Sequence, residues 1–182
     1  MAKLILGDGD YGFLSSTQLP NKEYTEKTIP LNSSKLAVTG DFNNIAKNHC
    51  GAVCALNIAS VLSQKEPRLL IEGDCVKSFK AIHKIIGSGP TPSIAKGLSA
   101  YARRCGASLK YQSEIKCFED IKDAADRGNP CGILLANAPA DWHWVMCVGY
   151  REYQNEDGFI RICDGWHRNA DRFYTNNRLN CG

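Results

Sequence analysis

The chain has 182 residues, of which 43% are apolar and 23% charged, which suits one globular domain with a core of its own. Its net charge of +3 comes from scattered basic residues. The longest arginine run, Arg103–Arg104, lies inside a helical pattern, so we expect no nucleic-acid partner. No apolar run approaches the roughly 20 residues of a membrane helix, and Leu4–Leu6 is too short for a secretion signal. We therefore expect no membrane span and a cytoplasmic protein, or a secreted one if a signal segment has been removed.

The nine cysteines are an odd number and fall mostly in apolar runs, as do Cys54, Cys131, Cys147 and Cys163. A disulfide framework is typical of much shorter chains, so we expect free thiols, most of which pack as small core residues. No paired Cys-x-x-Cys spacing occurs. Two groups of residues could bind zinc. One is His49 with Cys50 and Cys54, and the other is Cys163 with His167; neither has the spacing of a known zinc finger. We predict no metal and no cofactor.

In chain order, residues 1–40 are predicted to be irregular. Leu4–Leu6 and Tyr11–Leu14 are candidates for short strands. The stretch from Ser15 to Ser34 is rich in Thr, Asn, Ser, Lys and Pro, which is typical of a loop packed on the domain.

Three helices are predicted next. Apolar residues at helical spacing run from Cys50 to about Ser63, and almost the whole surface of that helix is apolar, so it should be buried at the centre. Asp74 is a suitable N-cap for a helix over 76–86. Thr91-Pro92-Ser93 opens the third helix, over 94–105, and Gly106 ends it.

The second half of the chain favours strands. Residues 108–115 alternate between polar and apolar, and 118–127 form a short helical pattern. Strands are expected at 131–135, 144–150, 159–163 and 172–175, with a hairpin turn at 155–158. The whole chain is therefore predicted to be one α+β domain with a helical lobe over 41–107 and a mostly antiparallel sheet lobe over 108–182.

Cys50 is the candidate nucleophile. It opens the central apolar helix, where unpaired N–H groups and the helix dipole favour an anion. A histidine from across a cleft would hold it as a thiolate–imidazolium pair, so we expect a lowered thiol pKa. Gly51 leaves space beside the sulfur for a substrate carbonyl.

His143 is the best of four histidines for the base, because it stands at the entry of an apolar strand where its ring can face a cleft. His49 should point away from Cys50, and His83 and His167 lie in less suitable settings. Asp164 ends the neighbouring strand, so its carboxylate is expected to fix the tautomer of His143. Asp141 is the rival for that role.

Four further residues are assigned to the surroundings of the sulfur. Asn44 is expected to provide an amide donor to the oxyanion hole, beside the Cys50 main-chain N–H. The three tryptophans are candidates for lining the substrate site or for simple core packing: Trp142, Trp144 and Trp166.

These residues resemble those of papain-like cysteine peptidases, and in particular the bacterial C39-type peptidase-like group. The similar segments are Asn48-His49-Cys50-Gly51, His143 with the strand ending in Gly149-Tyr150, and Ile162-Cys163-Asp164-Gly165-Trp166. The likeness covers roughly 41–173, with Ala52 where the group usually has Pro and Asn44 where it more often has Gln. It implies a papain-like fold, with a helical part whose nucleophile helix packs on the sheet, and a Cys-His-Asp triad.

The expected activity is thiol-dependent hydrolysis of peptide or amide bonds through a thioester, with a peptide or protein as substrate and a monomer as the default state. Two alternatives stay open. The same triad can pass the acyl group to an amine instead of water. The domain can also be a catalytically silent module that binds peptides, although Cys50, His143 and Asp164 are all present.

Overall fold

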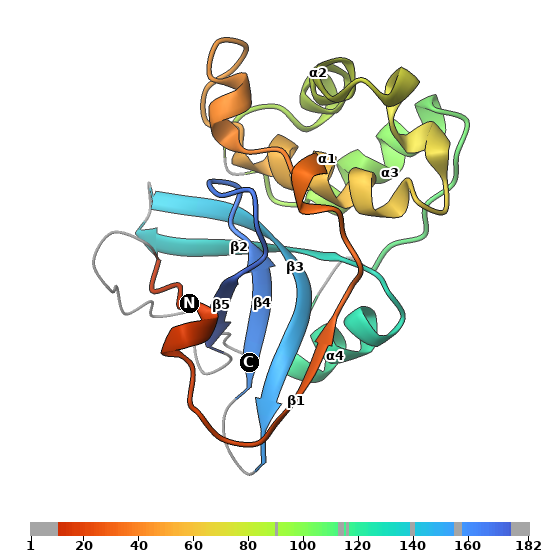
Figure 1. Ribbon diagram of the computed structural model, residues 1–182. Coiled ribbons are helices and arrows are strands. Elements are labelled where there is room, and N and C mark those ends of the chain that lie inside the picture. Colours follow the sequence, from red (N-terminus) through yellow and green to blue (C-terminus); the bar gives the residue numbers. More distant parts are fainter. Residues whose placement is uncertain are drawn as a thin grey trace.

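A layer of three helices sits at one end of the molecule in the computed structural model, which describes residues 11–89, 91–112, 115, 117–138, 141–154 and 158–175. The helices are α1 (Cys50–Leu62), α2 (Cys75–Ile86) and α3 (Ile94–Arg104) (Figure 1). The apolar sequence of α1 leads to its burial on all sides, as predicted. The predicted N-cap of α2 is also confirmed, because Asp74 Oδ1 accepts from the N–H groups of Val76 and Lys77.

The second half of the chain forms most of a five-stranded antiparallel sheet. Its strands are β1 (Tyr24–Thr28), β2 (Cys131–Ala138), β3 (Asp141–Tyr153), β4 (Phe159–Cys163) and β5 (Arg172–Thr175). The long strand β3 pairs with β2 along its first half and with β1 along its second half. Strand β4 pairs with β3 from Met146 onward, and β5 follows β4. The chain is thus an α+β protein, as the sequence predicts.

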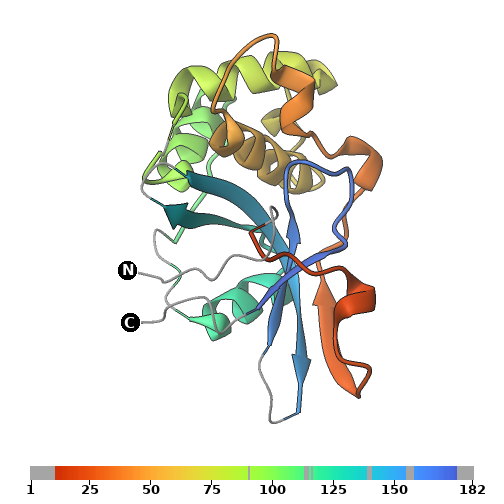
Figure 2. The ribbon, with the colours of Figure 1, turned by 90° about the vertical axis from the view of Figure 1, so that its left-hand side faces the viewer.

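Alternate residues of β3 enter two separate hydrophobic clusters, because successive strand side chains point to opposite faces. Trp144, Met146 and Val148 belong to the cluster built around α1. Val145 and Cys147 belong to the other cluster, which includes residues of α4 (Phe118–Asp126). Figures 1 and 2 show α4 lying apart from the layer of α1, α2 and α3.

Strand β1 corrects the prediction of a loop from Ser15 to Ser34. Its sequence, Tyr-Thr-Glu-Lys-Thr, is polar and largely exposed, so it carries no apolar alternation. Glu26 of this strand forms ion pairs with Arg151 and Arg161, and the Arg151 guanidinium lies 3.9 Å from the centre of the Tyr24 ring. Contacts with residues over a hundred positions away therefore hold the strand in place.

Several other elements expected from the sequence differ from those in the structure or lie outside the described residues. Residues 108–112 and 115 form no strand, although their pattern alternates. Leu14 forms one isolated bridge, to Phe173. Leu4–Leu6 and most of the expected hairpin turn at 155–158 lie outside the described residues. Short 3-10 helices occur at Ser16–Gln18, Ser33–Lys35, Thr39–Phe42, Pro67–Leu69 and Ile71–Gly73.

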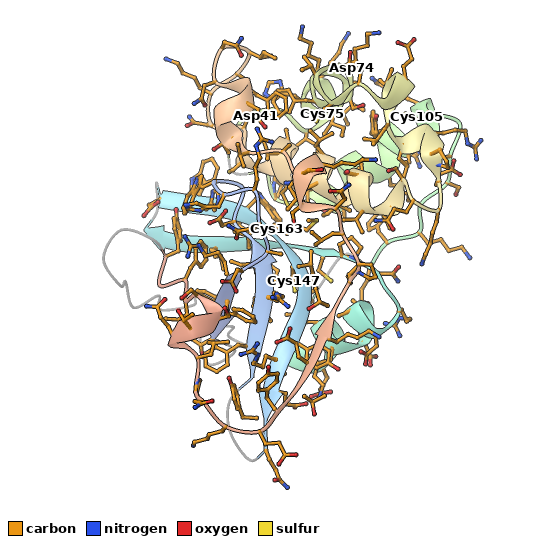
Figure 3. The ribbon with its side chains drawn as sticks, in the orientation of Figure 1. Asp41, Asp74, Cys75, Cys105, Cys147 and Cys163 are labelled. Carbon is orange, nitrogen blue, oxygen red and sulfur yellow. The ribbon has the colours of Figure 1, made fainter. Side chains whose placement is uncertain are left out.

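The eight cysteines that the structure describes are free thiols, as predicted. Cys147 and Cys163 are enclosed in the sheet, whereas Cys75 and Cys105 lie in the helical layer (Figure 3). Over the described part of the chain, none of the helices combines the length and apolar character needed to span a bilayer.

Candidate active site

Cys50 is the first residue of α1, and 9% of its surface is exposed to solvent. The turn that brings it there contains Asn48 in the left-handed region, at a φ of 50°, which asparagine tolerates better than most residues. The adjoining His49 ring is held elsewhere, by a 2.9 Å contact with the Thr39 carbonyl and by packing against Phe79. Since no side chain caps α1, its first N–H groups remain near the sulfur.

The edge of β3 beside Cys50 is open over its first residues. Strand β4 ends at Cys163, which pairs with Met146, so Trp144 has β2 on one side and no strand of the described chain on the other. At this edge, the main-chain N–H of Trp144 lies near the Cys50 sulfur and lowers the pKa of the thiol. Figures 1 and 2 show the loop after β4 reaching the helical layer, where the Gly165 carbonyl accepts from the Thr39 N–H.

The His143 ring is fixed in one orientation. Its Nε2 lies 2.5 Å from the main-chain carbonyl oxygen of Asp164, and its face stacks on Trp166 at 4.1 Å between ring centres. A carbonyl can only accept, so Nε2 carries the proton, and in the neutral ring Nδ1 is left as the basic nitrogen. Burial lowers the pKa of His143, although the Asp164 carbonyl and the charges of Asp164 and Asp141 favour the imidazolium.

Three observations relate the position of this ring to the first turn of α1. A Cβ built on Gly165 would lie 4.0 Å from both His143 Nε2 and Val53 Cγ1, and Val53 stands three residues after Cys50 on the same helix face. The residue after His143 directs its main-chain N–H at the sulfur. The Tyr11 ring lies 5.7 Å from the ring of His143. The sulfur and the imidazole form no hydrogen bond with each other in this conformation.

The expected lowering of the thiol pKa is wrong for this conformation. Burial raises the pKa of Cys50, and the N–H groups of Trp144, Gly51 and Cys50 itself lower it by a smaller amount. Because burial disfavours both charged forms, the resting pair consists of a neutral thiol and a neutral imidazole.

The Asp164 carboxylate does not contact His143 in the way expected. Its Oδ1 accepts from the main-chain N–H groups of Trp166 and His167, at 2.9 and 2.8 Å. Its Oδ2 lies 2.6 Å from His167 Nδ1 and 3.5 Å from Arg172 Nε. The carboxylate therefore shapes the loop after β4, whereas the main-chain carbonyl of the same residue orients His143.

This division predicts a mild effect for Asp164→Asn. The amide oxygen can still accept from the Trp166 and His167 N–H groups, and the carbonyl that holds His143 is untouched. We expect kcat/KM for an activated ester to fall by no more than about tenfold, whereas losing a carboxylate that orients the base directly costs about 10⁴-fold in serine proteases. Asp171→Asn, the same change in the same loop, is the control. A loss near 10⁴-fold would restore the carboxylate to the orienting role.

The remaining predicted residues fall into two groups. Trp144 is buried against Gly51, and Trp166 stacks on His143, so both belong to the site. Trp142 is half-buried and packs on the cluster around α1. Asn44 is exposed in the turn after Thr39–Phe42, and no described contact joins it to Cys50.

Tyr11 and Phe13 are site residues that the sequence pattern did not reveal. The Tyr11 hydroxyl donates to the carboxylate of Asp141, and its ring lies 5.8 Å from that of Trp166. Phe13 packs on the same tryptophan at 6.0 Å. Tyr11 has a φ of 53°, an uncommon conformation for a residue other than glycine. The segment thus packs beside the ring of His143 and against the tryptophan that stacks on it.

We expect Tyr11→Ala to raise the rate at which iodoacetamide alkylates Cys50 by about fivefold. An aromatic contact of this kind contributes about 1 kcal/mol, and losing it favours the uncovered state by that factor. The measurement is the mass of the Cys50 peptide over time. Tyr24→Ala is the control, because that tyrosine is 47% exposed on β1 and stacks only away from the site. An unchanged rate would mean that Tyr11 does not limit access.

The geometry brings together a thiol, an imidazole with a basic Nδ1 and several main-chain N–H donors, which are the groups that acyl transfer requires. Among the described residues, no three His, Cys, Asp or Glu side chains are grouped so as to hold a metal ion. In comparisons with known proteins, no family model, no curated protein and no solved structure matches the chain.

Proposed function

We propose that this protein hydrolyses peptide or amide bonds by the thiol mechanism of papain-like enzymes, as the resemblance to the C39-type group implies. One observation carries the proposal: at the start of the central helix, the Cys50 sulfur lies near enough to the main-chain N–H of Trp144, the residue after His143, for that N–H to lower the thiol pKa. The α+β arrangement and the fixed ring of His143 support it.

The neutral resting pair defines the first step. His143 Nδ1 accepts the thiol proton while Cys50 Sγ attacks the substrate carbonyl carbon, so the thiolate forms only as it reacts. The imidazolium then gives its proton to the leaving amine, which leaves a thioester on Cys50. Because burial lowers the pKa of His143, its charged form is a stronger acid and releases this proton readily. In the second half of the reaction, Nδ1 activates the water that hydrolyses the thioester.

The substrate is a peptide or protein segment in this proposal. Burial of Cys50 and His143 keeps water away from the reacting groups, so a substrate must displace part of the cover formed by Tyr11 and Phe13. Trp166, which stacks on His143, is then the aromatic surface next to the scissile bond.

The decisive experiment uses p-nitrophenyl acetate, which acylates an active thiol without needing a matched peptide. We expect a burst of p-nitrophenolate and an acetyl group found by mass spectrometry on Cys50. Digestion of a peptide library, with Cys50→Ala as control, then tests amide cleavage. Acetylation spread over exposed thiols such as Cys75, with none on Cys50, would reject the proposal.

A further inference from the structure

The indole of Trp144 holds a polar atom that the fold leaves unpaired. The residue is 7% exposed, and its Nε1 is buried without a hydrogen-bond partner in the described chain. An indole nitrogen carries one hydrogen and can only donate, and buried tryptophans usually have an acceptor for it. An unpaired buried donor is unfavourable, so this N–H is suited to bind an acceptor that the described chain does not supply.

This N–H lies at the start of α1. A Cβ built on Gly51 would lie 3.2 Å from Trp144 Cδ1 and 3.6 Å from Trp144 Nε1, so the nitrogen-bearing edge of the indole faces the second residue of the helix. The absence of a side chain at Gly51 is what permits this approach. The main-chain N–H groups of Cys50 and Gly51, in the same turn, lower the pKa of the thiol.

Building on the proposed function, we infer that Trp144 Nε1–H is a donor of the oxyanion hole, together with the main-chain N–H of Cys50. When Sγ bonds to the substrate carbonyl carbon, the thiol proton passes to His143, and the electron pair of the C=O bond moves onto oxygen. That oxygen, now negative, accepts from the helix N–H and from the indole N–H. The tetrahedral centre then expels the leaving group, and the C=O bond re-forms in the thioester.

The indole replaces Asn44 in this role. Asn44 is exposed and without a described contact to Cys50, whereas Trp144 contributes its main-chain N–H to the sulfur and its indole to the adjoining residue. Packing against Gly51 fixes the direction of this donor before the substrate oxygen arrives, and a donor aimed in advance is what makes oxyanion stabilisation effective.

The test compares two reactions of the same sulfur. Acetylation by p-nitrophenyl acetate passes through an oxyanion, whereas alkylation by iodoacetamide does not. In Trp144→Phe we expect acetylation of Cys50 to slow by about 10²-fold, as for the loss of one oxyanion donor, with alkylation nearly unchanged. Because phenylalanine is smaller, a second variant carries 3-benzothienylalanine at 144, in which sulfur replaces the N–H with little change in shape. Trp142→Phe, on the same strand, is the control and should preserve both rates.

Three outcomes would overturn the inference. If Cys50 is acetylated at the wild-type rate in both variants, the indole N–H is not used. An equal loss of both reactions would show that Trp144 only positions the sulfur. A wild-type protein that is alkylated but never acetylated at Cys50 would refute the proposed function and the inference with it, and the wild-type reaction alone identifies this case.

Discussion

Replacing Cys50 by alanine is expected to abolish thioester formation and hydrolysis while the domain stays folded. The sulfur is the atom that forms the thioester, so activity should fall to the background rate of the buffer. The lost side-chain atom lies at the edge of the cluster around α1, where we expect a cost of about 1 kcal/mol in the free energy of unfolding. Ester turnover and urea denaturation measure the two effects separately.

Cys54→Ala is the matched control. Cys54 lies one turn further along α1 and is fully enclosed, and burial raises its pKa well above the usual range. This change should cost at least as much stability as Cys50→Ala and leave most of the activity. If Cys50→Ala unfolds the protein, or if Cys54→Ala removes the activity, Cys50 is a core residue and another thiol reacts.

His143→Gln is expected to lower kcat/KM by about 10²- to 10⁴-fold, the usual contribution of a general base. Glutamine can donate to the Asp164 carbonyl through its amide, but it has no basic atom in place of Nδ1. His167→Gln is the control, because it makes the same change in the histidine that contacts the Asp164 carboxylate. If the losses are reversed, His167 is the base.

The pH dependence follows from the lowered pKa of His143. The mechanism needs the neutral ring, so activity should persist as the pH falls through 6.5 and disappear only as it passes the folded-state pKa below that value. The free energy of unfolding changes with pH in the same direction as the activity. Between the two pKa values the unfolded chain binds a proton that the folded chain does not, so the free energy of unfolding declines as the pH falls below 6.5.

His143→Gln should remove this part of the pH dependence of stability. Urea denaturation of both proteins between pH 7.5 and 5 measures it. A wild-type pH–activity profile with its acid limb above 6.5 would contradict the neutral pair, because it would require a raised pKa for the base.

The helices and the central strands could be predicted because their signals are local. The apolar run of α1, the Asp74 cap of α2 and the aliphatic run of β4 each depend on a few neighbouring residues. The strand β1 could not be predicted in this way, since its polar residues are held by Arg151 and Arg161 from distant strands.

The candidate site also has features that local sequence indicates and features that depend on contacts between distant segments. Residue types and their order along the chain were enough to propose Cys50 and His143 as candidates, because a thiol at a helix start and a histidine at a strand entry are properties of short segments. The orienting group of His143 could not be read this way, since a main-chain carbonyl leaves no trace in the residue letters. Nor could the cover by Tyr11, which joins residues 130 or more positions apart.

By itself, then, the sequence determined the helices and the central strands, whose signals are local, and which side chains are candidates to react. Only the tertiary structure decided the charge state of the reactive pair, because the pKa of a thiol or imidazole depends on how much water and which dipoles surround it after folding. It also decided the partners of Asp164 and left the indole of Trp144 unpaired beside Gly51, since those contacts exist only where distant segments pack together.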